Sequence, residues 1–72
     1  MDILAETNWR YYIKMLNEKL AKRGKKPINN EEIDFCLRWI DKTSKLEFIP
    51  SKVRVLLFHL PITIFALKNR IS

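Results

Sequence analysis

This chain has to hold its fold together without cross-links. It has one cysteine, Cys36, so no disulfide can form within it. Cys36 and His59 together give too few soft ligands for a structural zinc site, which takes about four. A chain of 72 residues is small, and such a domain buries only about 60% of the surface that its unfolded form exposes. We therefore expect one small domain over residues 1–72, stabilised by the hydrophobic 47% of its residues or completed by a partner.

Cysteine use and the N-terminus indicate where the protein works. A lone cysteine is typical of a reducing compartment, and the first ten residues do not form a basic segment followed by an apolar run. The longest uncharged stretch, Val55 to Leu67, is shorter than the roughly 20 residues that a membrane-spanning helix needs. These features predict a cytoplasmic protein.

The first helix is predicted over residues 7–23, with residues 1–6 as a separate lead-in. Its start is assigned to Thr7 or Asn8, which are good N-cap residues. Gly24 suits a left-handed position after the last turn, and Pro27 prevents the helix from resuming. The apolar residues at helical spacing, which should face the core, are Trp9, Tyr12, Ile13, Leu16 and Leu20.

The second helix is predicted over residues 30–43. Asn29 as N-cap puts Glu32 at the third helical position, which is the pattern of a capping box. Phe35 and Trp39 form a second apolar side, away from the main one. Such a helix is either sandwiched between neighbours or presents one side to a partner.

The C-terminal third predicts one interrupted helix or two short ones. Lys42 to Pro50 reads as a linker with a short extended piece at 46–49, and Ser51 can cap the next helix. The segment 53–71 is apolar almost all the way round, as expected of an enclosed helix. Proline removes a backbone donor and clashes with the preceding turn, so Pro61 predicts a kink, or helices 52–60 and 61–70.

The fold class predicted is all-α: a compact bundle of three to four short helices, the last kinked or broken at Pro61. Two further sequence patterns bear on this prediction. A polar stripe of His59, Thr63, Ala66 and Arg70 would survive along a continuous last helix. The β-branched pattern also permits a hairpin of 46–49 with 53–56, although no glycine-containing turn supports it.

Catalysis is not expected. Cys36 lies on the main apolar face of the second helix, where burial raises a thiol pKa and leaves it inert. Glu31, Asp34 and Asp41 could face a hard cation, but an ordinary Asp34–Arg38 pair explains them. One glycine cannot build a phosphate-binding glycine-rich loop. We predict no catalytic residue, metal, cofactor or small-molecule substrate.

The strongest functional signal is a concentration of positive charge. The formal net charge is +6, and residues 10–26 alone carry seven cations and one acid. Two cations would satisfy the negative end of a helix dipole, so a cluster this dense predicts binding to phosphate. A solubilising face is the alternative. The predicted nucleic-acid-binding residues are Lys14, Lys19, Lys22, Arg23, Lys25 and Lys26.

Sequence-specific reading of DNA is not expected. The connection after the second helix is longer than a helix-turn-helix uses, and the segment VRVLLFHL offers almost no polar side chains to base edges. We predict an accessory component of nucleic-acid machinery that contacts phosphate. The alternative is an adaptor, subunit or inhibitor that docks on a larger protein through its aromatic residues, namely Tyr11, Phe35 and Trp39. Membrane binding is a weaker option, because the apolar face of the basic helix is needed for the fold.

Overall fold

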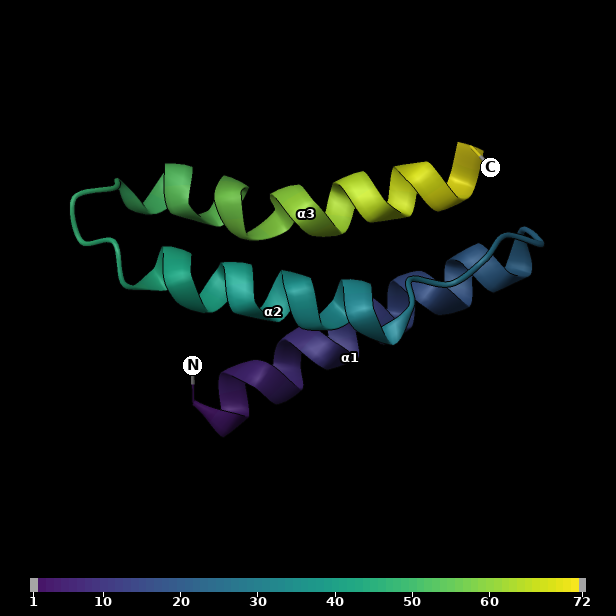
Figure 1. The fold of residues 1–72 in the computed structure, drawn as a ribbon, viewed down its shortest axis with the longest axis horizontal. Coiled ribbons are helices and arrows are strands. Elements are labelled where there is room, and N and C mark those ends of the chain that lie inside the picture. Colours follow the sequence, from purple (N-terminus) through teal and green to yellow (C-terminus); the bar gives the residue numbers. More distant parts are fainter. Residues whose placement is uncertain (1, 72) are drawn as a thin grey trace.

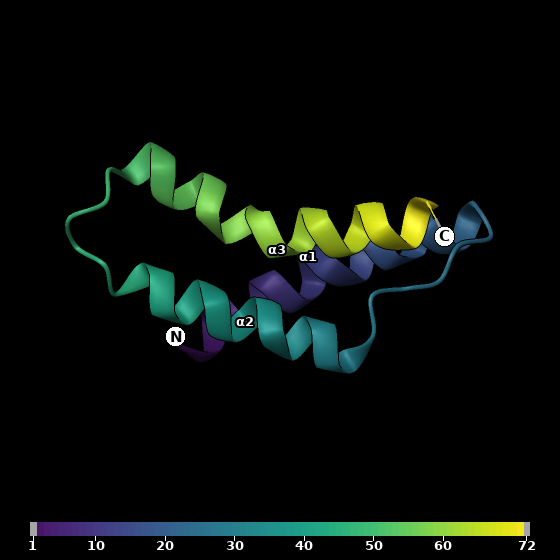
Figure 2. The same ribbon diagram turned by 45° about the horizontal axis from the view of Figure 1, so that its top comes forward.

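The computed structural model describes residues 2–71, which form three helices. They are α1 (Ile3–Lys22), α2 (Asn30–Ser44) and α3 (Ser51–Ile71). α2 and α3 run antiparallel side by side, and α1 packs obliquely against them (Figures 1 and 2). The molecule measures 40 × 23 × 18 Å. The predicted all-α bundle is confirmed, and residues 2–71 contain no strand, so the alternative hairpin does not form.

α1 begins earlier than predicted. Its N-cap is Asp2, whose carboxylate accepts a hydrogen bond from the backbone N–H of Ala5 at 2.7 Å. Thr7, a predicted cap, lies inside the helix and donates its hydroxyl to the carbonyl of Ile3. The prediction of a separate lead-in over 1–6 is therefore wrong for the described residues. It relied on an apolar face, whereas a carboxylate cap can start a helix whose first turn stays exposed.

The end of α1 follows the sequence signal. Gly24 has a φ of +70°, a conformation that costs glycine little. The N–H of Lys25 donates to the carbonyl of Leu20, and that of Gly24 donates to Ala21, which is the Schellman pattern. The loop after it is tied back by Asn17, whose amide both accepts from the backbone N–H of Ile28 at 2.7 Å and donates to its carbonyl at 3.2 Å.

Side chains hold the start of α2 and the loop that follows it. The capping box is present: Asn29 accepts from the N–H of Glu32, whose carboxylate accepts from the N–H of Asn29. After Ser44 the chain forms a loop without the expected extended piece. The guanidinium of Arg54 holds this loop through the carbonyls of Leu46 and Ile49.

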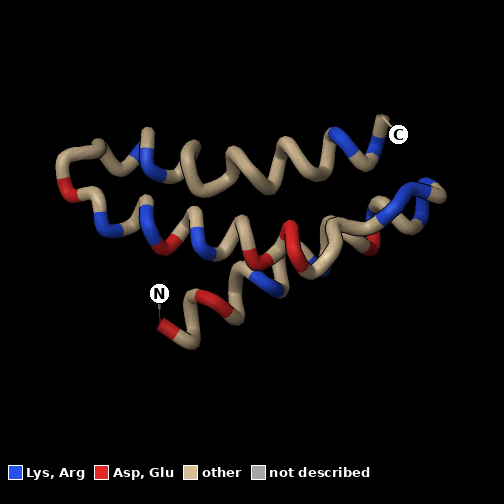
Figure 3. The backbone as a smooth tube through the Cα atoms, in the orientation of Figure 1, with Lys and Arg blue, Asp and Glu red and all other residues tan. Residues whose placement is uncertain are grey.

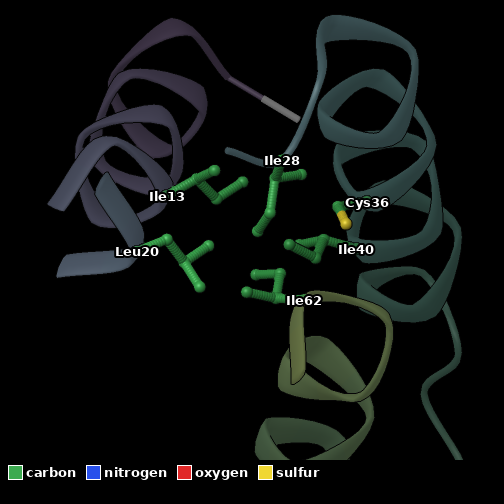
Figure 4. Close-up of a cluster of buried hydrophobic side chains, with 6 residues drawn as sticks. All are labelled: Ile13, Leu20, Ile28, Cys36, Ile40 and Ile62. Atoms are coloured by element: carbon green, nitrogen blue, oxygen red, sulfur yellow. The ribbon is translucent and has the colours of Figure 1, made fainter. Parts of the chain in front are cut away.

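The core is small and includes residues from all three helices and the first loop. α1, the first loop, α2 and α3 all contribute to one cluster, in which the side chains point toward one another (Figure 4). Its buried members are Ile13, Leu20, Ile28, Cys36, Ile40 and Ile62. Trp9, Leu16 and Phe58 are among the partly buried side chains around it. The residues predicted to face the core from the first helix therefore do so, except that Tyr12 stays 38% exposed.

α3 runs without interruption through Pro61, so the predicted helices 52–60 and 61–70 are wrong. Proline has no N–H, which leaves the carbonyl four residues earlier, that of Leu57, without its helical donor. The indole N–H of Trp39 in α2 donates to this carbonyl at 2.7 Å. Because the neighbouring helix supplies the missing donor, part of the cost of the proline is offset and the helix continues.

α3 is also not enclosed, contrary to the prediction. One side packs on α1 and α2 through Ile62 and Pro61, which are buried, while the opposite side faces outward with large apolar residues such as Leu56 and Ile64 exposed. The apolar character of this helix therefore exceeds what its own core uses. Within residues 2–71, no helix has the length and apolar character that crossing a bilayer requires.

Candidate nucleic-acid interface

Positive charge collects at one end of the molecule. The C-terminal end of α1, the loop after it and the C-terminal end of α3 lie together there, and Lys and Arg positions dominate this end of the backbone (Figure 3). We call this cluster the basic tip. It consists of Lys19, Lys22, Arg23, Lys25 and Lys26 from the first helix and its exit, with Lys68 and Arg70 from α3.

A groove between α1 and α3 is lined by cations from both parts of the basic tip. Its volume is about 290 Å³, and Lys19 and Arg23 from α1 and Arg70 from α3 line it. Its floor is apolar and includes Leu20 and Leu67. We call it the α1–α3 groove. Among the described residues, its lining includes no carboxylate, so it places cations from two parts of the chain beside an apolar surface.

Glu18 is the acid nearest in sequence to the basic tip, and no ion pair joins it or any other described carboxylate to these cations. The ion pairs between described residues join Arg10 to Glu6 at 3.0 Å, Arg10 to Asp34 at 3.6 Å, and Lys45 to Asp41 at 3.4 Å. None of them includes a residue of the basic tip. Unpaired cations held together raise the local positive potential and attract polyanions.

One predicted residue lies apart from the others. Lys14 is exposed on α1, but it precedes Lys22 by eight residues, or about 12 Å along the axis. Five helical steps also place it about 140° round the helix from Lys19. The structure therefore brings together five of the six predicted cations and leaves Lys14 on another side of α1.

The sequence interpretation missed Lys68 and Arg70. The available signal was the polar stripe along the last helix, because three of its members, Thr63, Ala66 and Arg70, line the α1–α3 groove. That stripe could not be matched to the basic helix without knowing that the end of α3 packs beside the end of α1.

The three aromatic residues predicted to contact a partner differ in exposure. Tyr11 is the most accessible, at 63%. Phe35 is 48% exposed and packs edge-on against Phe65 of α3, with 5.8 Å between ring centroids. Trp39 is half-buried and bonded to α3. Of the three, Tyr11 has the greatest free surface for a partner.

Cys36 and His59, which could in principle act together as a nucleophile and its base, lie in different surroundings. Cys36 is fully buried in the core cluster. His59 is half-buried and packs edge-on against the rings of Trp9 and Tyr12, with centroids 5.1 and 5.3 Å away. No hydrogen bond joins Cys36 and His59 among the described side chains. The pKa of the Cys36 thiol is raised from 9.0 to about 11, first by burial and then by the negative charge of Glu32.

This raised pKa predicts a loss of stability in alkali. Above about pH 9 the unfolded chain releases the thiol proton while the folded chain retains it, so the free energy of unfolding falls as pH rises toward 11. At about pH 10.5 the expected loss is about 2 kcal/mol. Urea unfolding of wild type and Cys36→Ala, at about pH 8 and about pH 10.5, should show this extra loss in wild type alone. Equal losses in the two proteins would contradict it.

The acidic residues of α2 are placed differently from the predicted pairing. Asp34 pairs with Arg10 of α1, whereas Arg38 donates to the backbone carbonyl of Asp34 rather than to its carboxylate. Across residues 2–71 there is no group of three or more His, Cys, Asp or Glu side chains placed to hold a metal ion.

Comparison with known proteins adds no assignment to this geometry. No protein-family model matches the chain, and neither the curated proteins nor the solved structures include a match to it.

Proposed function

We propose that this protein is a non-catalytic accessory component of nucleic-acid machinery, and that it binds the phosphate backbone through the basic tip. One observation carries the proposal: α1, the loop after it and α3 together bring seven cations to one end of the molecule, and no described carboxylate pairs with them. A solubilising surface needs no such concentration, since dispersed charges serve it equally well.

The chemistry of the basic tip suits phosphate better than base edges. Five of its seven members are lysines, which act as mobile point charges rather than as rigid two-pronged donors. Contacts of this kind set position and affinity and carry little sequence information. The arrangement of α2 and α3 agrees with this, because they run side by side rather than crossing as in a helix-turn-helix (Figures 1 and 2). We therefore expect binding that depends weakly on sequence.

A salt titration tests the proposal. Single-stranded DNA, single-stranded RNA and duplex DNA of about 20 nucleotides, each labelled with a fluorophore, are titrated at several salt concentrations from about 50 to about 200 mM. Four to six neutralised phosphates on duplex predict a log–log slope of about −4 to −5. Polyglutamate of matched charge is the control, and its binding should be weaker.

Two results would contradict the proposed phosphate binding. If all three nucleic acids fail to bind at about 50 mM salt, the basic tip is not a phosphate site. Binding to polyglutamate as tight as binding to nucleic acid would also reject it, because the basic tip would then be recognising negative charge on a polypeptide rather than phosphate.

A further inference from the structure

The outward side of α3 carries a continuous apolar stripe. Six large residues recur every three or four positions over about five helical turns, which places them within about 80° of one another round the helix. Each is between 45% and 83% exposed. We call this surface the α3 stripe: Val53, Leu56, Leu60, Ile64, Leu67 and Ile71. Its length is about 27 Å, and Leu67 joins it to the α1–α3 groove.

We propose that the α3 stripe and the adjoining α1–α3 groove bind an acidic amphipathic helix of a partner protein. The partner would lie along α3 as a fourth helix, with its apolar residues on the stripe and its carboxylates toward the flanking cations. In this mode of recognition, an amphipathic helix places its apolar face in a hydrophobic groove. The inference does not depend on the proposed phosphate binding.

Charge beside the stripe selects an acidic partner. α3 has no aspartate or glutamate. By helical spacing, Lys52 and Arg70 border one edge of the stripe and Lys68 borders the other. The groove adds Arg23 and Lys19 from α1. A partner helix with carboxylates beside its apolar residues would therefore meet opposite charge on both sides.

The same charges disfavour a second copy of this chain. In an antiparallel pair of α3 helices, Lys52 of one copy would lie near Arg70 of the other, and in a parallel pair the flanking cations would meet no carboxylate on the facing helix. Like charges facing each other across an interface destabilise it. With no acid on α3 to relieve this repulsion, self-association is not the expected use of the stripe.

The shape of the surface favours a helix over a lipid bilayer. A stripe only about 80° wide corresponds to the narrow seam of packed helices, whereas helices that lie on membranes combine an apolar face with a large opposing polar one. The opposite side of α3 is instead occupied by the core, through Ile62 and Pro61. The concave groove beside Leu67 is also better filled by side chains than by a flat surface.

The area available is adequate for such a complex. The six residues expose an apolar patch on the order of 600 Å², at the upper end of what small monomers show. A standard stable interface buries about 800 Å² on each partner. The stripe together with the apolar floor of the α1–α3 groove approaches this value, so a single partner helix can bury most of it.

Three synthetic peptides test the proposal. Each has roughly 20 residues, the length of helix that covers α3. The first has a leucine stripe flanked by glutamates, the second replaces the glutamates with lysines, and the third scrambles the first. Fluorescence anisotropy should show binding of the glutamate peptide with an affinity at least about 10-fold above that of the other two.

Variants of the protein identify the surface. Leu56→Gln with Ile64→Gln changes two exposed positions and should weaken binding of the glutamate peptide at least about 10-fold while thermal unfolding and nucleic-acid binding stay unchanged. The matched control is Leu4→Gln with Met15→Gln, which removes two exposed apolar residues from α1 and should leave peptide binding intact.

Several outcomes would overturn the inference: equal affinity for the glutamate and lysine peptides, no binding of the glutamate peptide, equal effects of the two variant pairs, or a preference for lipid. For the last, vesicles of phosphatidylcholine with phosphatidylglycerol are tested in parallel, and binding to them that the stripe variant abolishes assigns the stripe to a membrane. Dimerisation through the stripe, detected by sedimentation, also overturns it and assigns the stripe to a second copy.

Discussion

Reversing four charges at the basic tip is expected to weaken nucleic-acid binding by more than about 100-fold at low salt. The variant carries glutamate at Lys22, Arg23, Lys25 and Lys26. Each cation that no longer neutralises a phosphate releases fewer counterions, so the salt slope on duplex should also become shallower, by up to about 3.6 for four contacts. Anisotropy titrations of wild type and variant at about 50 mM salt and above measure both effects.

The control carries the same change in net charge elsewhere. Glutamate at Lys14, Lys42, Lys45 and Lys52 alters four exposed lysines outside the basic tip. If binding followed net charge alone, both variants would lose it equally, and the assignment to the basic tip would be wrong. Acids at the C-terminal end of α1 also oppose the helix dipole, at up to about 1 kcal/mol each. The glutamine versions of both variants avoid this cost and should rank in the same order.

The second large effect concerns stability. Trp39→Phe is expected to lower the free energy of unfolding by about 3 kcal/mol, because the half-buried carbonyl of Leu57 loses its donor and the smaller ring leaves space beside α3. A domain of this size has a total stability of only about 4–10 kcal/mol. Urea unfolding monitored by far-ultraviolet circular dichroism should therefore show a large shift of the midpoint.

A double-mutant cycle with Pro61→Ala tests whether the lost indole hydrogen bond causes this destabilisation. Alanine at 61 supplies a backbone N–H, so the carbonyl of Leu57 regains its ordinary helical donor. In the Pro61→Ala background, Trp39→Phe should lower the free energy of unfolding only through lost packing, by about 1 kcal/mol. The difference between the two backgrounds gives a coupling energy of about 2 kcal/mol between the two positions. A cost for Trp39→Phe that is the same in both backgrounds would show that the indole hydrogen bond does not support the proline.

Predictions that depend on a few neighbouring residues were the successful ones. The capping box of Asn29 and Glu32 and the left-handed Gly24 form as the sequence indicates. Each is complete within a single turn of helix, so tertiary packing has little to add. The start of α1 was missed although Asp2 is a good cap. The prediction followed the apolar face that packs on the core, whereas Ile3 and Leu4 in the first turn lie off that face and are exposed.

The sequence predicted only part of the candidate site. Five cations near Gly24 are close together in the chain, and their density alone indicated phosphate binding. Arg70 is far away in the sequence, and only the packing of α3 beside α1 brings it into the same groove. The α3 stripe was interpreted as core for the same reason, since hydrophobicity does not say which side of a helix its neighbours cover.

The sequence by itself therefore determined the helical class, the caps of Asn29 and Gly24 and the concentration of positive charge, because these depend on residues close together in the chain. Tertiary structure decided the rest. Pro61 should end a helix by its local chemistry, but Trp39 from another helix supplies the missing donor. Such a contact depends on where two helices meet in space, and that position follows from the packing of the whole chain.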